Sequence, residues 1–350
     1  MKKSIVFSLV MSVFVSLSGC GGGGDNSTGN GGQPSSGTPT TPTSPTPTTP
    51  ATPAVPASVA PATSVPAPTY AATDERSKLF ATLNAYRVQM GVGALAQDRL
   101  LDTAAQAHAD YLKANGALLA HAEDPLKPGY TGTDPRARAM KAGVPATTWV
   151  AENIGGGGSA SSCFLGLTNS VYHLQSLTSN AESIGLGFNT DCVIELGTFT
   201  GQTGLSMNSG TPVGGGQQMA ANALAYSPLD GEMVDKALGG ESPQPAPDIA
   251  NPGHPVMVRV RADLMSDVLS VASFTLVDDS GAPVPGRILI APNAKAASVG
   301  AAVTDSLLNP AVAFFLPLKP LGSAITYTAT FSGARNSVPI SKSWSFKTYP

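Results

Sequence analysis

Charged side chains are scarce in this chain. Asp, Glu, Lys and Arg together make up only 12% of its 350 residues, and the formal net charge is −3 at pH 7. Such a chain has little electrostatic attraction to phosphate backbones, so we expect no nucleic-acid partner. Gly and Pro are abundant instead, with 38 and 30 copies, a balance typical of an exported protein with long linkers.

A run long enough to span a bilayer is missing at the N-terminus. Two lysines precede an apolar stretch of about 13 residues, whereas a membrane-spanning helix needs about 20. This is the pattern of a secretion signal, and its end, Leu17-Ser18-Gly19-Cys20, resembles a bacterial lipobox. That resemblance implies cleavage before Cys20 and acylation of its thiol. We therefore expect a signal peptide at 1–19 and a lipoprotein anchored through Cys20 in the bacterial cell envelope, at the outer membrane because Gly21 rather than Asp follows.

Cysteine is almost absent, with three copies in the chain. Cys20 belongs to the signal, so Cys163 and Cys192 are the only possible internal pair. In an oxidising compartment we expect them to form a disulfide, which would contribute about 3 to 4 kcal/mol by closing a loop. A metal or redox role would need partner residues at close spacing, and neither cysteine has one.

Apolar side chains are almost missing from residues 20–72, a stretch of Gly, Ser, Thr and Pro that we expect to be a disordered tether. Helical periodicity then begins near Asp74. It predicts helices that end at Gly91, at Gly116 and at Gly143, and a fourth over 160–174. Alternating residues over 183–188 and 192–199 predict two antiparallel strands. We therefore expect an α+β domain over 73–204.

The rest of the chain has few helical signals. Residues 205–222 are rich in Gly and polar residues and are expected to form a linker. The region 223–350 contains short β-rich runs separated by Gly, Pro and Asp turns, which favour an all-β immunoglobulin-like sandwich. The expected strands are 256–260, 269–277, 287–290, 325–331 and 341–347.

Histidine is also scarce, so the search for catalytic groups is short. Of the four histidines, His254 is expected in a turn. His108 is expected on the apolar face of the second helix, as a core residue with its polar atoms satisfied, which leaves His121 and His173. The sequence contains no His-Glu-x-x-His zinc motif and no Gly-x-Ser-x-Gly nucleophile elbow. Gly155 to Gly158 lacks the Gly-Lys-Ser/Thr ending of a phosphate-binding loop.

Several short elements, in order over about 130 residues, together resemble one known family. They are Asn84-x-x-Arg87, Leu95, Leu100, Ala104, His108-Ala109, Ala120-His121, Gly129-Tyr-Thr-Gly132, Arg138-Ala139, Glu152-Asn153-Ile154, Ser170-x-x-His173 and Ile184-Gly-Leu-Gly187. The series is similar to the CAP superfamily, which comprises cysteine-rich secretory proteins, antigen 5 and pathogenesis-related 1, with bacterial SCP-type domains. The resemblance implies an α-β-α sandwich.

The resemblance also implies a cavity where two histidines and two acidic residues meet, and in several family members a divalent cation. His121 and His173 match the histidines, and Glu152 matches one acid. Two neutral imidazoles are suitable ligands for Zn²⁺. The binding residues expected are therefore His121, Glu152 and His173, with His121 and His173 as metal ligands. An equal alternative for Glu152-Asn153-Ile154 is a buried pair that satisfies backbone groups.

The sequence departs from the family pattern in one important way. Between Glu152 and Glu182 there is no Asp or Glu, so the second acid has no match, and Leu167 stands where many bacterial members have Trp. The leading hypothesis is a protein that binds a lipid or an envelope glycan without turnover. A metal-assisted hydrolase using His121, His173 and Glu152 is the second, and a structural or adhesive surface protein the third.

Overall fold

The computed structural model describes residues 58–116, 119–201, 214–262, 267–296 and 302–350. The expected signal peptide, Cys20 and most of the expected tether lie outside these residues. All described residues belong to one compact unit. Within them, no helix is both long and apolar enough to cross a membrane.

The N-terminal half contains five helices and a small sheet. The helices are α1 (Glu75–Met90), α2 (Arg99–Asn115), α3 (Pro135–Lys141), α4 (Ala160–Thr168) and α5 (Tyr172–Leu177). Asp74, Asp98 and Asp134 each cap a helix by accepting a backbone N–H bond, and Gly91 and Gly116 end α1 and α2 in the left-handed conformation. The expected first three helices are thus confirmed.

The single helix expected over 160–174 is wrong in its extent. Helix α4 ends at Thr168, with Asn169 as its C-cap, and α5 starts only at Tyr172. The helix is interrupted by contacts with a distant segment of the chain. The backbone carbonyl of Asn169 accepts a hydrogen bond from the N–H of Gly239, and the side-chain amide of Asn169 donates to the carbonyl of Ala237. Such contacts from far along the chain are invisible to local periodicity.

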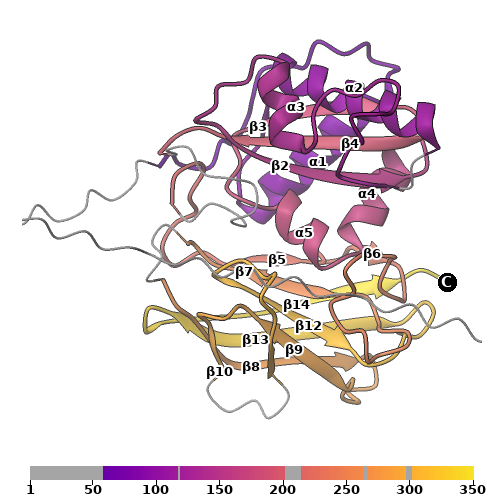
Figure 1. Cartoon of the computed structure of the whole chain (residues 1–350). Helices are drawn as coiled ribbons and strands as arrows, with labels where there is room; N and C mark the ends of the chain where they lie inside the picture. Colours follow the sequence, from indigo (N-terminus) through magenta and orange to yellow (C-terminus); the bar gives the residue numbers. More distant parts are fainter. Residues whose placement is uncertain (1–57, 117–118, 202–213, 263–266, 297–301) are drawn as a thin grey trace, which may run out of the picture. The chain divides into compact units, whose positions relative to one another are not determined.

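The four-stranded sheet has the order β1-β3-β4-β2, formed by β1 (Ala96–Gln97), β2 (Trp149–Gly156), β3 (Ser183–Phe188) and β4 (Asp191–Thr198). Helices α2 and α3 cover one face, and α1, α4 and α5 lie on the other (Figure 1). Gly185 permits the close approach of α2, since a Cβ atom there would lie 2.1 Å from the carbonyl carbon of Leu101. The expected three-layer α-β-α sandwich is confirmed.

The C-terminal half is built of strands. One sheet has the order β10-β8-β13-β14-β6 and the other β11-β9-β12-β7-β5. The strands are β5 (Ala225–Ser227), β6 (Met233–Val234), β7 (Val256–Arg259), β8 (Leu269–Asp278), β9 (Gly286–Ile290), β10 (Lys295–Ala296), β11 (Ala302–Thr304), β12 (Val312–Pro317), β13 (Thr326–Arg335) and β14 (Val338–Thr348). The five expected strands are present as β7, β8, β9, β13 and β14, and Phe274, Phe331 and Trp344 pack in the core between the sheets.

One hydrophobic core joins the two halves. Leu83 of α1 and Leu167 of α4 belong to the same buried cluster as Met257 and Phe314 of the β-sandwich. Polar contacts run alongside it, such as the 2.7 Å hydrogen bond between the hydroxyls of Tyr86 and Ser227. The helical half and the β-sandwich are therefore packed against each other through a shared hydrophobic core.

Parts of the expected tether and linker are packed against this unit. Val59, inside the tether range 20–72, exchanges backbone hydrogen bonds with Gly216 and Gln218, inside the linker range 205–222. The buried side-chain amide of Gln217 accepts the N–H of Ala62 and donates to the carbonyl of Ala94, which precedes β1. The backbone groups of these polar stretches thus find their partners in each other and in the domain.

Candidate functional site

The structure brings His121, Glu152 and His173 to the wall of one cavity of about 380 Å³. His121 lies in the segment after α2, Glu152 on the edge strand β2, and His173 in the first turn of α5. Residues of the C-terminal half, among them Glu241 and Leu307, line the same cavity. The cavity therefore lies where the helical half meets the β-sandwich.

Glu152 links one cavity histidine to a buried arginine. Its Oε1 lies 2.8 Å from Nδ1 of His121, and its Oε2 accepts a 2.5 Å bond from Nη2 of Arg138 on α3. Burial alone would raise the pKa of Glu152, but the hydrogen bond from His121 and the charge of Arg138 outweigh it and hold the pKa below its usual value. Glu152 is therefore an anion at neutral pH, and it orients the His121 ring by accepting its Nδ1 proton.

Behind this pair lies a second buried polar cluster. His108 of α2 places Nδ1 2.8 Å from Oε1 of Glu123 and Nε2 2.9 Å from the carbonyl of Ala120. Both ring nitrogens therefore have an oxygen atom within hydrogen-bond distance. Glu123 in turn accepts the backbone N–H groups of Thr131 and Gly132. The expectation that His108 is a satisfied core residue is confirmed, and its cluster supports the loop that carries His121.

His173 contacts Ser170 through Nδ1. Its Nδ1 lies 2.9 Å from the Oγ of Ser170, which is also within hydrogen-bond distance of the carbonyl of Leu167. With the hydroxyl hydrogen directed to Leu167, Ser170 accepts the Nδ1 proton, which leaves Nε2 of His173 with its lone pair. Burial, followed by the nearby His121, lowers the pKa of His173 to about 4, so the ring is neutral at physiological pH.

A second acid is present, although it comes from outside the helical half. Glu241 lies in the segment between β6 and β7, and its buried Oε1 is 3.5 Å from Nδ1 of His173. The sequence analysis missed it because the family pattern places this group earlier in the chain. Only the packing of the β-sandwich against α5 reveals it.

Two further polar side chains lie beside Glu152: Asn153, expected as part of a buried pair that satisfies backbone groups, and Glu195, which was not predicted. Asn153 lines the cavity and is buried, and neither atom of its side-chain amide has a hydrogen-bond partner within the described ranges. Glu195, directly opposite Glu152 on β4, is fully buried, and burial followed by the charge of Glu152 raises its pKa well above the usual range. The buried position of Glu195 therefore favours its protonated form.

The chemistry of the two cavity histidines suits a cation. In both rings Nδ1 carries the proton, and neither Nε2 has a hydrogen-bond partner in the part of the chain that the structure describes. Metal-binding histidines have this arrangement, with one nitrogen donating to a neighbour and the other free. In the described residues, however, no three His, Cys, Asp or Glu side chains form a group that could hold a metal ion.

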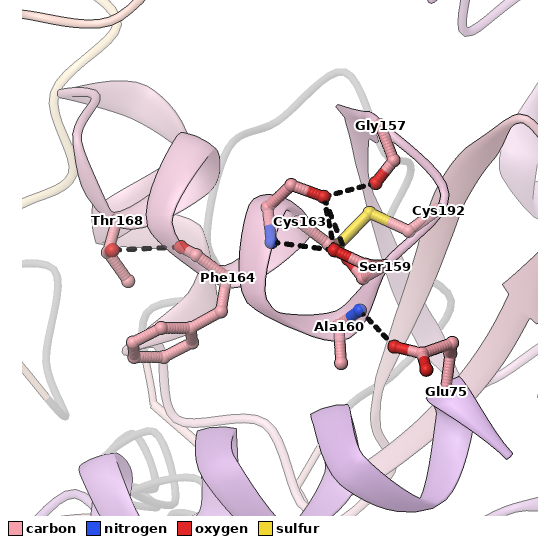
Figure 2. The surroundings of a disulfide bond; sticks show 9 residues. Glu75, Gly157, Ser159, Ala160, Cys163, Phe164, Thr168 and Cys192 are labelled. Atoms are coloured by element: carbon pink, nitrogen blue, oxygen red, sulfur yellow. Dashed lines mark hydrogen bonds between the residues drawn. A yellow bond between two sulfur atoms is a disulfide. The ribbon is translucent and has the colours of Figure 1, made fainter. Parts of the chain in front are cut away.

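The expected disulfide between Cys163 and Cys192 is present (Figure 2). It joins α4 to the start of β4, beside the N-terminus of α4, where Ser159 caps the helix and Glu75 of α1 accepts the N–H of Ala160. The bridge therefore fixes α4 to the sheet, and α4 leads directly into the segment that carries Ser170 and His173.

One family model matches the chain, over residues 80–196, and it is described as CAP, the cysteine-rich secretory protein family. No curated protein matches the chain. The matched range runs from α1 to β4 and includes His121, Glu152, His173 and the disulfide, but not Glu241. The three-layer half of this chain is therefore a CAP domain, of the cysteine-rich secretory protein family.

Proposed function

We propose that this protein is an extracytoplasmic lipoprotein whose CAP domain binds an uncharged polar ligand, of the envelope glycan type, without turning it over. The observation that carries the proposal is the cavity that His121, His173 and Asn153 share. Its volume of about 380 Å³ falls within the range of small-molecule sites, about 300–1,000 Å³.

The composition of the cavity wall supports a polar ligand. The buried amide of Asn153 has a donor and an acceptor without partners among the described residues, and the neutral His173 ring offers an Nε2 lone pair. A hydroxyl or acetamido group would satisfy these atoms, whereas an acyl chain would leave them buried without partners at a cost of about 1–3 kcal/mol each.

The acids beside the cavity support binding rather than turnover. Both oxygens of Glu152 are engaged, by His121 and by Arg138, and both oxygens of Glu241 accept backbone N–H groups of α5. A general base must be able to reach and remove a proton from the ligand. These carboxylates instead orient side chains and backbone.

Calorimetric titration of the full-length mature protein with soluble N-acetylated oligosaccharides tests the proposal. We expect saturable binding that weakens about tenfold in Asn153→Ala and in His121→Ala, since each loses about one hydrogen bond. Leu126→Ala, on a side chain that is 90% exposed, is the control and should bind like the wild type. Binding to phospholipid vesicles but not to oligosaccharides, or hydrolysis that is lost in His173→Ala, would contradict the proposal.

The location belongs to the same proposal and rests on the N-terminal pattern. The apolar stretch that ends in Leu17-Ser18-Gly19-Cys20 supports export and anchoring through acylated Cys20, at the outer membrane of a bacterial cell. Metabolic labelling with an alkynyl fatty acid should mark the wild type and not Cys20→Ala. Unlabelled wild-type protein in the cytosol would contradict it.

A metal-assisted hydrolase is the second candidate, favoured by the tautomers of the two histidines. His121 and His173 would hold Zn²⁺ through Nε2, and the ion would supply a Lewis acid. Glu152 would keep the proton on Nδ1 of His121. Equilibrium dialysis with Zn²⁺ should then give one bound ion per chain, and His121→Ala should release it. Unchanged binding in that variant would exclude this candidate.

A further inference from the structure

The segment that carries Glu241 is fixed against the CAP domain. Gly239 donates its backbone N–H to the carbonyl of Asn169, and Asn169 donates its amide to the carbonyl of Ala237. A Cβ atom on Gly239 would lie 2.9 Å from that same carbonyl oxygen of Asn169, so a larger residue would push the two segments apart. The close approach delivers Glu241 to the start of α5.

Glu241 takes the place of a helix cap. Residue Val171, at the N-cap of α5, provides no side-chain cap of its own. Instead Oε2 of Glu241 accepts the N–H of Val171 at 2.9 Å, and Oε1 accepts those of Tyr172 at 2.6 Å and His173 at 3.3 Å. One carboxylate from the C-terminal half thus satisfies three backbone donors in the first turn of a CAP helix.

The same carboxylate faces the imidazole of His173. Its Oε1 lies 3.5 Å from Nδ1, on the side of the ring that also contacts Ser170. Two oxygen acceptors therefore surround Nδ1, and both favour the ring form that carries hydrogen there. The form with hydrogen on Nε2 would place the Nδ1 lone pair against the carboxylate.

Other contacts hold α5 from the β-sandwich side. Arg259 of β7 donates to the backbone carbonyl of Gln175, whose own amide donates to the carbonyl of Leu307. The hydroxyl of Tyr172 donates to Asp305, the residue after β11, at 2.8 Å. Helix α5, with His173 on it, is thus positioned by the C-terminal half as much as by the CAP domain.

We propose that Glu241 is a positioning residue of the CAP cavity, supplied by the C-terminal half, which fixes the Nδ1–H tautomer of His173 and makes ligand binding depend on that half. Glu241 takes the role of the second acid that residues 153–181 lack. The dependence of binding rests on the proposed function, whereas the effect on the His173 ring does not.

The test compares Glu241→Gln and Glu241→Ala with wild type in the full-length mature protein. Long-range ¹H–¹⁵N NMR of the histidine rings reports the tautomer, and calorimetry with N-acetylated oligosaccharides reports binding. Glu232→Gln is the matched control, because Glu232 is a half-buried carboxylate that accepts the N–H of Leu229 and does not line the cavity. Thermal melting of each variant checks that it is folded.

We expect wild-type His173 to show a single Nδ1–H form, and both Glu241 variants to show a mixture with at least tenfold weaker oligosaccharide binding. Glu241→Gln keeps one oxygen for the backbone donors, so it stays folded if Glu241→Ala does not. A His173 spectrum that both variants leave unchanged, or that Glu232→Gln changes equally, would overturn the proposal. The wild type could bind no oligosaccharide while the His173 tautomer ratio still changes in the Glu241 variants. That result would refute the proposed ligand and support the positioning role of Glu241.

Discussion

The buried ion pair between Arg138 and Glu152 should couple strongly in a double-mutant cycle. The two side chains are fully buried, and their charged atoms are 2.5 Å apart. Removing one partner of such a pair costs about 3–5 kcal/mol, because it leaves a buried charge without compensation. In Arg138→Met, Glu152 keeps its bond from His121, so we expect a loss near the lower end, about 3 kcal/mol.

The double variant Arg138→Met/Glu152→Gln should be less destabilised than the sum of the single variants. Neither a stranded cation nor a stranded anion remains in it, so we expect an interaction free energy of about 2 kcal/mol. Urea unfolding followed by tryptophan fluorescence measures the free energy of unfolding of the wild type, the two single variants and the double variant. Trp149 of β2 and Trp344 of β14 report on the two halves.

The coupling should also depend on pH with a definite sign. Because the folded-state pKa of Glu152 lies below its ordinary 4.5, the pair stabilises the protein above that value, and the stabilisation is lost as the pH falls through the lowered pKa. Additivity of the two substitutions within about 0.5 kcal/mol at pH 7 would refute the ion pair. So would a coupling that persists after Glu152 is protonated.

Three further predictions concern stability. Replacing both Cys163 and Cys192 by Ala should lower the free energy of unfolding by about 3 to 4 kcal/mol, since the bridge spans a sequence separation of 29. Burial lowers the pKa of His254 to about 3, so His254 takes up a proton when the protein unfolds below pH 6.5. Between pH 6.5 and pH 3 the free energy of unfolding of the wild type should therefore fall by roughly 3–5 kcal/mol more than that of His254→Leu. Gly185→Ala should destabilise by about 3 kcal/mol or more through the clash with α2, whereas Gly166→Ala, with open space in α4, should stabilise by about 0.5–1 kcal/mol.

Chemical denaturation measures all three, and each has an outcome that contradicts it. The cysteine variant should equal wild type treated with a reductant, and a wild type insensitive to reduction would count against the bridge. Parallel acid-unfolding curves for wild type and His254→Leu would show that His254 is not the proton acceptor. Equal stability of the two glycine variants would mean that α2 does not lie as close to β3 as described.

The sequence predicted the elements that are governed by local chemistry. Asp98 and Gly116 bound α2 because a carboxylate cap and a left-handed glycine act within a turn of the helix itself. Strand β12 was missed because all six of its residues are buried and the run does not alternate, a pattern that a buried helix shares. Strand β2 was missed because Glu152-Asn153-Ile154 was considered only as a motif.

The site residues likewise divide into those that the family pattern identifies and those that only tertiary packing brings to the cavity. His121, Glu152 and His173 were selected through the family pattern, and the structure places them around one cavity. Glu241 could not be found in this way, because strands β3 to β6 and the end of the family match lie between it and His173. His254 was expected in a turn and is buried, as its contact with Phe346 depends on how the sandwich closes.

The hydrophobic core that Leu83 and Leu167 share with Phe314 limits how this protein can be recombined. Transfer of residues 80–196 alone into another protein would expose buried apolar side chains to solvent, both on the transferred segment and on the rest of this chain. A fusion protein should therefore contain the chain from Val59 to its last residue without interruption.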